Sequence, residues 1–269
     1  MSIDFIKIIL GLLIIFILSI LTYKLQYLDR GGVIAGIIIG SIILIGFGWP
    51  ALILMMIFFI FSTFSTRLRY NYKRQLGLGQ EKGGKRGWRN TLANGGIAAS
   101  SALASLFLGG EIFFAFFLGA MATSMSDTLA TEIGLLSRSR PRLITNLKKK
   151  VGAGTSGGIS LLGEIMVVSG SLLIGILAFF LELSSIPFFT IILLTLLGGL
   201  TGSHIDSILG ATIQSMNRCI ICGIITESNN HHNKPTESFK GLKIIENNTV
   251  NFLSTVAGAS TAAVVLIII

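Results

Sequence analysis

Five acidic residues are notable because each lies at or near the end of a strongly apolar segment. They are Asp29, Asp127, Glu132, Glu164 and Asp206. Carboxylates inside a membrane are costly, so their placement is informative. Mg²⁺ prefers one or two carboxylates together with phosphate oxygens and water. If these acids meet beside a basic surface, they suit a magnesium-bound polyphosphate. The alternative is that each one pairs with a neighbouring Arg or Lys.

Two of these acids occupy equivalent positions in a weak internal repeat. Segment 119–128 aligns without gaps to segment 198–207. The matched pairs are Gly119 with Gly198, Ser124 with Ser203, Asp127 with Asp206, and Thr128 with Ser207. Both copies end helices that are expected to run in the same direction. The repeat is therefore parallel, and it puts an Asp and an adjacent hydroxyl at one membrane depth.

A glycine-rich stretch precedes a later apolar segment, with the sequence Lys148-Lys-Lys-Val-Gly-Ala-Gly-Thr-Ser-Gly-Gly-Ile-Ser160. It contains GxGxxG but no preceding strand, and it lacks the Gly-Lys-Ser/Thr of a P-loop. Glycines still permit close backbone approach, and free amides at a helix N-terminus attract phosphate. The pattern therefore favours phosphate binding, aided by Thr155, Ser156 and the lysines. A flexible loop with small-residue helix packing is the alternative.

A second basic stretch, Lys85 to Gly95, leads into another apolar segment in a similar way. Arg86 and Arg89 suit a phosphate clamp. Asn94 is expected just inside the membrane as a polar ligand group. Trp88 is interpreted as an interfacial anchor rather than a base-stacking platform.

The chain has two cysteines, in the sequence Cys219-Ile-Ile-Cys222-Gly, followed by the adjacent pair His231-His232. This pattern has half the look of a zinc knuckle, whose four ligands are Cys and His, so it indicates a candidate Zn²⁺ site. Adjacent histidines rarely bind the same ion, and the chain has no third Cys. The alternative is an ordinary reduced loop without metal.

The elements that position these residues follow from composition. The chain of 269 residues is 52% hydrophobic and 12% charged, with mean hydropathy +0.81. Eight runs are long and apolar enough to cross a bilayer. They lie near 4–22, 32–48, 51–66, 92–109, 112–134, 157–181, 187–206 and 249–269. We therefore predict an all-α fold, one polytopic transmembrane helical bundle over 1–269 with about eight helices. Ile208 to Thr226 is an ambiguous ninth run, and a count of seven to nine covers the alternatives.

The basic residues are strongly segregated. Alternation of eight spans puts the loops 23–31, 67–91, 135–156 and 207–248 on one side of the membrane. These loops contain all but Lys7 of the 21 basic residues. The positive-inside rule makes these loops cytoplasmic and puts both termini outside. The charge indicates topology and contact with anionic membrane lipids, and it does not indicate a nucleic-acid partner because no aromatic–basic interleaving accompanies it.

Taken in order, these landmarks resemble a family of integral membrane proteins that includes animal transmembrane protein 19 and the plastid phytyl-phosphate kinase. The resemblance runs from about residue 29 to the C-terminus. It is carried by Asn94-Gly95, Asp127-Thr-Leu-Ala-Thr-Glu-Ile-Gly134, Pro141-Arg-Leu-Ile-Thr145, Gly154-Thr-Ser-Gly-Gly-Ile-Ser160, Gly202-Ser-His-Ile-Asp-Ser-Ile-Leu-Gly-Ala211 and Asn251. The family's archaeal pattern has a Cys at the position of Asn233 and an Asp near Asn247-Asn248. With Asn233 in place of that Cys, the zinc site lacks one possible sulfur ligand. Without the Asp, the start of the last helix has one acid fewer.

The resemblance implies a kinase in the cell membrane of an archaeal-type prokaryote, with its active face cytoplasmic. It would transfer a phosphoryl group from CTP or ATP to a phytyl- or geranylgeranyl-type monophosphate. Asp127 and Asp206 are assigned to Mg²⁺, and Glu132 is a further ligand or a neighbouring group. The phosphate-binding residues are Arg86, Asn94, Arg142, Lys148, Gly154, Thr155, Ser156, Gly157, Gly158, Ser160, Ser203 and Ser207. Phosphoryl transfer needs mainly positioning and charge neutralisation, so no nucleophilic triad is required.

The rival function is a transporter of a small anionic or lipid-phosphate solute, because repeats and intramembrane Asn residues also line translocation paths. Apart from Asn94, the expected helices carry almost nothing strongly polar toward the outer side, which disfavours a through-path. A non-catalytic scaffold is a third alternative. The sequence leaves open whether the chain forms a homo-oligomer.

Overall fold

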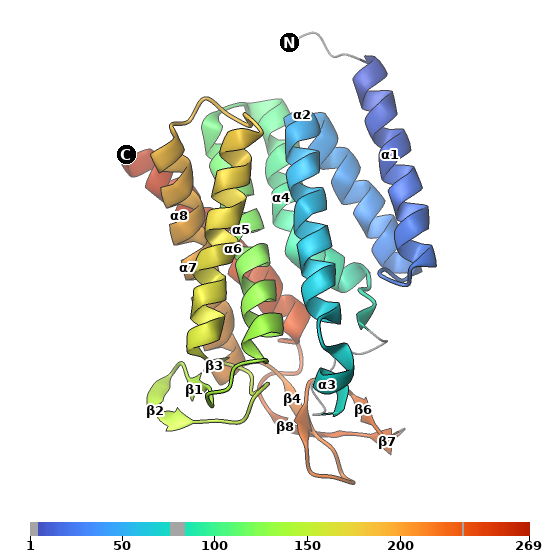
Figure 1. Ribbon diagram of the computed structural model, residues 1–269, viewed down its shortest axis with the longest axis vertical. Helices are drawn as coiled ribbons and strands as arrows, with labels where there is room; N and C mark the ends of the chain where they lie inside the picture. Colours follow the sequence, from blue (N-terminus) through green and yellow to red (C-terminus); the bar gives the residue numbers. More distant parts are fainter. Residues whose placement is uncertain (1–4, 76–83, 233) are drawn as a thin grey trace.

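The computed structural model describes residues 5–75, 84–232 and 234–269, and it is mainly helical (Figure 1). Lys82 and Asn233 lie outside the described residues. The helices are α1 Phe5–Lys24, α2 Arg30–Arg67, α3 Tyr70–Gln75, α4 Trp88–Leu108, α5 Glu111–Gly134, α6 Leu161–Phe180, α7 Phe188–Thr212 and α8 Asn247–Ile268. Seven of them, all except α3, are long and apolar enough to cross a membrane. The predicted transmembrane bundle is confirmed.

Helix α2 contains two of the eight predicted spans. Gly48 has non-helical dihedral angles (φ 78°, ψ −169°), and Pro50 follows it. The two halves fold back on each other, because Gly40 of the first half faces Leu52 of the second. The guanidinium of Arg67 also returns to the loop before α2, where it donates to the Leu25 carbonyl at 3.0 Å. The sharp turn thus accounts for the difference between seven long helices and eight predicted spans.

The connecting loops that carry the basic residues lie at one end of the bundle. The loops with the short strands are at the bottom of Figure 1, and the α1–α2 loop, higher in the view, is joined to the segment before α4 because the Arg86 amide donates to the Tyr27 carbonyl at 3.0 Å. The described chain begins and ends at the opposite end. Lys7, the one basic residue outside the four loops predicted from the sequence, lies near the opposite turn, because Trp49 Nε1 donates to the Lys7 carbonyl at 3.0 Å. We call the end that carries loops 25–29, 68–87, 135–160 and 213–246 the loop end, in each case for the described residues.

Helix α5 is the most buried span and α1 the least. Small residues allow α5, α7 and α8 to pack closely: a β-carbon on Gly198 of α7 would lie 3.0 Å from Gly119 Cα and 2.9 Å from the Gly258 carbonyl oxygen. Thr123 joins the same contact by donating to the Gly198 carbonyl at 3.2 Å. Because Gly119 and Gly198 are the first matched pair of the internal repeat, the repeat corresponds to two parallel, directly packed helices (Figure 1). Close approach through small residues is typical of membrane helices.

The loop end contains short strands, which the predicted all-α fold did not include. They are β1 Arg142–Leu143, β2 Asn146–Lys150, β3 Gly158–Ile159, β4 Met216–Arg218, β5 Ile225–Thr226, β6 Asn230–His231, β7 Lys234–Pro235 and β8 Glu237–Lys240. They form small antiparallel groups in the orders β2-β1-β3, β5-β4-β8 and β6-β7. The ambiguous ninth run, Ile208 to Thr226, is divided between the end of α7 and the first strands of the last group of loops, so it does not span the membrane.

Candidate functional site

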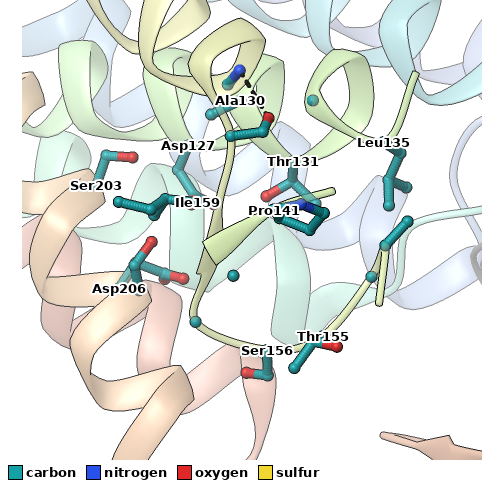
Figure 2. Close-up of a pocket in the computed structure, with 18 of the residues that line it drawn as sticks. Asp127, Ala130, Thr131, Leu135, Pro141, Thr155, Ser156, Ile159, Ser203 and Asp206 are labelled. Carbon is teal, nitrogen blue, oxygen red and sulfur yellow. Dashed lines mark hydrogen bonds between the residues drawn. The ribbon is translucent and has the colours of Figure 1, made fainter. Parts of the chain in front are cut away.

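Two adjoining cavities lie at the loop end. The smaller, of about 160 Å³, is lined by the glycine-rich loop and the ends of α5, α6 and α7, and we call it the glycine-loop cavity (Figure 2). The larger, of about 1830 Å³, is lined by four cations, Lys85, Arg86, Arg89 and Lys243, and also by six acidic residues. We call it the basic cavity after its four cations. Both cavities are lined by Asp127, Thr131, Leu135, Gly154, Asp206, Glu227 and Asn247. Three of these shared residues are carboxylates.

Asp127 and Asp206, predicted from the repeat, come from α5 and α7 and face the same space (Figure 2). Asp206 is held by α8. Its Oδ2 accepts a hydrogen bond from Ser254 Oγ at 3.1 Å. With the Asn251 amide turned so that its nitrogen faces acceptors, Nδ2 donates to the same oxygen at 3.2 Å. Asn251 and Ser254 are three positions apart, so they lie on one face of the helix.

The glycine-rich loop lies against the end of α7. Gly157 has φ 78°, and a β-carbon there would lie 2.6 Å from the Ser207 carbonyl oxygen, so glycine is required for this approach. Ser156 Oγ donates to Gln214 Oε1 at 2.7 Å. Ser160 caps α6, since its hydroxyl accepts from the Gly163 amide at 3.1 Å.

Most of the predicted phosphate-binding residues of this region meet at one cavity. The glycine-loop cavity is lined by Gly154, Thr155, Ser156, Gly157, Gly158, Ser160, Ser203 and Ser207. The glycine-rich loop and these hydroxyl-bearing residues therefore line the same cavity as the two aspartates (Figure 2).

Glu227 and Asn247 belong to the shared wall, and Gln214 lines the glycine-loop cavity beside them; none of the three was predicted from the sequence as a site residue. Gln214 Nε2 donates to Glu227 Oε1 at 2.8 Å, which fixes the carboxylate against both cavities. Gln214 is 1% exposed, an unusual burial for an uncharged polar residue outside the predicted helices. In the sequence, the one sign of a special role for Gln214 is that it interrupts the otherwise apolar run Ile208 to Thr226.

The basic cavity contains Arg86 and Asn94, both predicted as phosphate ligands. One guanidinium nitrogen of Arg86 donates to Thr66 Oγ1 at 3.2 Å. Burial lowers the pKa of Arg86 to about 10, and the charge of Glu132 opposes this change. Arg86 therefore keeps its positive charge at neutral pH. Asn94 Nδ2 donates to the Asn90 carbonyl at 2.9 Å, which leaves the amide oxygen available to a ligand.

Glu132 also lines the basic cavity, but the structure pairs it with a cation. Lys73 Nζ, from the short helix α3, lies 2.6 Å from Glu132 Oε2, and both side chains are almost fully buried. Lys73 was not singled out from the sequence. The pairing favours the neighbouring role of Glu132 over direct metal binding, because an ammonium group already neutralises its charge.

Other charged residues lie apart from this wall. Arg142 Nη1 donates to the Leu147 carbonyl at 2.6 Å on the exposed β1–β2 hairpin, and Lys148 is exposed on β2. Neither lines the two cavities. Glu164 lines the glycine-loop cavity and contacts His204 Nε2 at 3.3 Å. Asp29 caps α2 by accepting from the Gly32 amide at 2.9 Å.

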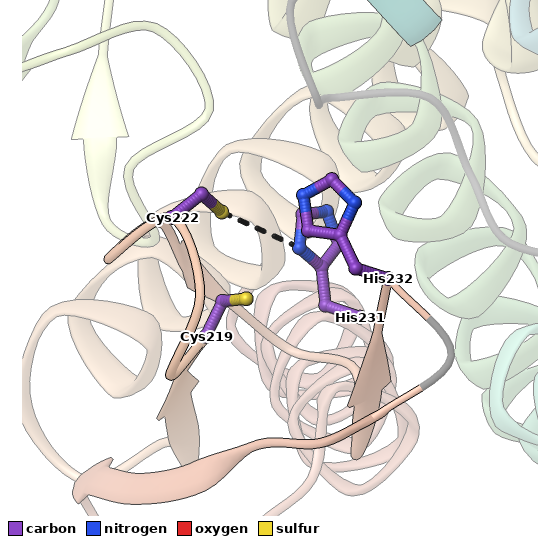
Figure 3. A group of neighbouring side chains, drawn as sticks. All are labelled: Cys219, Cys222, His231 and His232. Carbon is purple, nitrogen blue, oxygen red and sulfur yellow. Dashed lines mark hydrogen bonds between the residues drawn. The ribbon is translucent and has the colours of Figure 1, made fainter.

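The predicted zinc ligands also come together, as a separate cluster. The ligand atoms of Cys219, Cys222, His231 and His232 all lie within 4.8 Å of one another (Figure 3). A hydrogen bond from the Cys222 backbone amide is the main cause that lowers the pKa of the Cys219 thiol to about 6.

Comparison with known proteins agrees with this architecture. A family model described as integral membrane protein DUF92 matches residues 13–259. The chain belongs to this family. Within DUF92, the similar proteins include Protein PGR of Arabidopsis thaliana, which is 33% identical over 92% of both chains. The membrane protein MJ0933 of Methanocaldococcus jannaschii is 33% identical over 78% of this chain and 84% of its own. The chloroplastic protein VTE6 of Arabidopsis thaliana is 27% identical over 51% of this chain and 43% of its own. No solved structure matches.

The site of this DUF92 protein has a defined chemical character. Its shared wall offers carboxylate and amide oxygens, one neighbouring cavity is lined by the glycine-rich loop and hydroxyl side chains, and the other contains four cations beside further carboxylates. Such a set suits a cation bound by oxygen together with phosphate groups on either side.

Proposed function

We propose that this protein is a membrane-embedded prenyl monophosphate kinase. It would transfer the terminal phosphoryl group of ATP or CTP to a phytyl- or geranylgeranyl-type monophosphate and give the diphosphate. The family resemblance, which includes the plastid phytyl-phosphate kinase, supports the reaction class. The observation that carries the proposal is the carboxylate wall shared by two cavities, one lined by the glycine-rich loop and the other by Arg86 and three further cations.

The volume of the site supports two substrates rather than one. A pocket for a single small ligand is about 300 to 1000 Å³. The basic cavity, at about 1830 Å³, exceeds that range. It adjoins the glycine-loop cavity of about 160 Å³, which is of a size for phosphate groups and not for a whole nucleotide. The nucleotide phosphates would contact the loop Gly154 to Gly158, with the acceptor phosphate opposite.

The position of the cavities suits a lipid substrate. Both lie where the apolar helices end and the polar loops begin, so a prenyl tail would remain among the helices while its phosphate enters the site. None of the residues that line the cavities comes from the turns at the opposite end near 48–50, 109–111 or 182–187. This distribution supports a one-sided site over a transport path. By the positive-inside rule, that side is cytoplasmic.

The residues of the shared wall fit Mg²⁺. Asp127, Asp206 and Glu227 supply hard carboxylate oxygens, and Asn247 adds an amide oxygen to the same wall. No sulfur ligand lies among the residues that line the glycine-loop cavity. Bound Mg²⁺ would neutralise charge on the phosphate oxygens of the nucleotide.

The reaction balances without a general base. A phosphate monoester has a second pKa of about 6, so an oxygen of the prenyl phosphate is already deprotonated at neutral pH. This oxygen forms a bond to the γ-phosphorus, and the bond between the γ-phosphorus and the β,γ-bridging oxygen breaks. The products are the prenyl diphosphate and a nucleoside diphosphate. Arg86 would hold the acceptor phosphate and offset the repulsion between the two anions.

One assay tests this function directly. Purified protein in detergent would be given nucleotide labelled at the γ-phosphate, together with farnesyl, geranylgeranyl or phytyl monophosphate, with and without Mg²⁺. We expect labelled diphosphate only when Mg²⁺ and a prenyl phosphate are both present. If no acceptor and neither nucleotide gives product, while liposomes containing the protein show phosphate-solute flux, the kinase proposal is wrong and the chain is a transporter.

A further inference from the structure

The cluster of two cysteines and two histidines lies outside both cavities. Cys219 and Cys222 belong to the turn between β4 and β5, and His231 and His232 lie where the chain turns from β6 to β7 (Figure 3). Their four ligand atoms lie within 4.8 Å of one another. The catalytic chemistry described above uses none of these residues.

The cysteine turn has the backbone geometry that supports a metal-bound sulfur. The Ile221 amide points at Cys219 Sγ at a distance of 3.4 Å, and the Gly223 amide closes the turn by donating to the Cys219 carbonyl at 2.9 Å. Gly223 has φ 71°, which glycine adopts without steric cost. An amide hydrogen bond to a ligand atom orients it and stabilises its negative charge when a metal is bound.

The two adjacent histidines point toward the same place, although adjacent side chains rarely can. Successive side chains on a strand point to opposite faces, so adjacent histidines normally diverge. Here His232 has φ 54°, and its ring centroid lies 4.3 Å from that of His231. Both rings therefore face the sulfur atoms, and His231 Nδ1 is already 3.5 Å from Cys222 Sγ.

We propose that Cys219, Cys222, His231 and His232 bind one Zn²⁺ ion in a closed structural site. Two sulfurs and two imidazoles are a donor set that Zn²⁺ prefers. Tetrahedral bonds of about 2.0 to 2.3 Å place the ligand atoms about 3.3 to 3.8 Å apart, so the cluster needs to contract by about 1 Å at its widest. Because four protein ligands fill the tetrahedron, the ion offers no position to a substrate.

The segment around the cluster has little apolar core of its own, so a metal ion would stabilise it. Among its described residues between Gln214 and Glu246, the buried hydrophobic ones are Met216 and Cys219, while Ile220, Ile221 and other large side chains are exposed. A unit this small and without its own apolar core commonly depends on a metal. The ion would fasten the β4–β5 turn to the β6–β7 turn.

The residues between these two turns form part of the basic cavity. Glu227, Ser228 and Asn229 all line it, and Asn217 Nδ2 donates to the Ser228 carbonyl at 3.2 Å from β4. Zinc would therefore fix one wall of the cavity from outside. Only the effect on turnover rests on the proposed kinase function, since metal content and local order can be measured without substrate.

The test uses the full-length protein purified in detergent under reducing conditions. Elemental analysis should give about one zinc per chain. After exchange with Co²⁺, the visible absorption should be that of a tetrahedral site with thiolate ligands. Cys222→Ser and His231→Asn should each lose most of the metal. Ile221→Ala is the matched control, because its side chain is exposed and the substitution keeps the amide that faces Cys219; it should retain the metal.

Hydrogen exchange separates a local effect from misfolding. Removing the metal with a chelator should speed exchange in segment 216–240 while the protection of α5 and α7 remains unchanged. A reduced, folded protein without zinc, a metal content unaffected by Cys222→Ser, or a disulfide between the two cysteines in freshly purified protein would each overturn the proposal. Kinase turnover that fails while zinc remains at one per chain would count against the proposed function alone.

Discussion

Lys73 and Glu132 form an ion pair at 2.6 Å across 59 positions of sequence, and 2% and 3% of their side chains are exposed. Lys73 Nζ also donates to the Ser65 carbonyl at 2.9 Å. The pair thereby joins α3 to the ends of α2 and α5, next to the basic cavity. Two buried charges of opposite sign depend on each other, because either one alone would remain buried without its main counter-charge.

Replacement of Lys73 by alanine should therefore destabilise the protein strongly. We expect a loss of about 3 to 5 kcal/mol, the usual cost of breaking a buried pair from one side. The measurement is denaturant unfolding in detergent, followed by circular dichroism. Lys149→Ala, at an exposed position on β2, is the control and should change stability by less than about 0.5 kcal/mol.

The double variant Lys73→Met/Glu132→Leu separates stability from catalysis. Because both charges are removed together, it should recover most of the stability that the single variant loses. Any remaining loss of turnover then reports on Glu132 at the cavity. Equal stability of wild type and Lys73→Ala would show that the pair does not hold α3 in place.

Asp127→Asn and Asp206→Asn should each lower kcat by at least about 100-fold, since each removes a carboxylate from the shared wall with little change of volume. Steady-state kinase assays over a range of Mg²⁺ concentrations provide the measurement. Glu182→Gln, a matched carboxylate change at the opposite end of the bundle, should leave turnover unchanged. Wild-type activity in both aspartate variants would remove them from the reaction.

The sequence predicted these aspartates because membrane burial makes acids rare and the repeat relates two of them. Charge segregation predicted the loop end for a similar reason, since cations remain outside hydrocarbon. The pairing of Lys73 with Glu132 was not predictable in this way, because Lys73 resembles every other cation of its loop. Glu227 is likewise one of three acids in loop 207–248, and only the folded strands direct it to the cavity.

Arg142 and Lys148 show the opposite case, in which charge and neighbourhood suggested a phosphate ligand but the backbone places them elsewhere. The β1–β2 hairpin exposes both residues, while the glycines that follow return to the cavity. The strand register of a hairpin decides which side chains face inward. In a short polar segment this register cannot be predicted, because no alternation of apolar and polar residues indicates the inner face.

Ser254 is expected to act as a positioning residue for Asp206. Ser254→Ala removes the hydrogen bond to Oδ2 and should reduce the apparent affinity for Mg²⁺ by about 10- to 100-fold, with little effect on stability. The Mg²⁺ dependence of initial rates measures this effect. Ser105→Ala, which removes a hydroxyl bonded only within α4, is the control. An unchanged Mg²⁺ dependence would show that Ser254 has only a packing role.

Gly157→Ala should disrupt nucleotide binding through the backbone. The residue has φ 78°, and the added β-carbon would meet the Ser207 carbonyl and Ala211, so the glycine-rich loop would have to move away from α7. Left-handed backbone strain alone costs about 1 to 3 kcal/mol. We expect a rise in the KM for nucleotide that exceeds the rise for prenyl phosphate, measured in the same assay. Gly152→Ala is the matched control, because the nearest atom to its added β-carbon is Thr155 Oγ1 at 3.8 Å. If both glycine variants behave alike, the contact between the loop and α7 does not determine nucleotide binding.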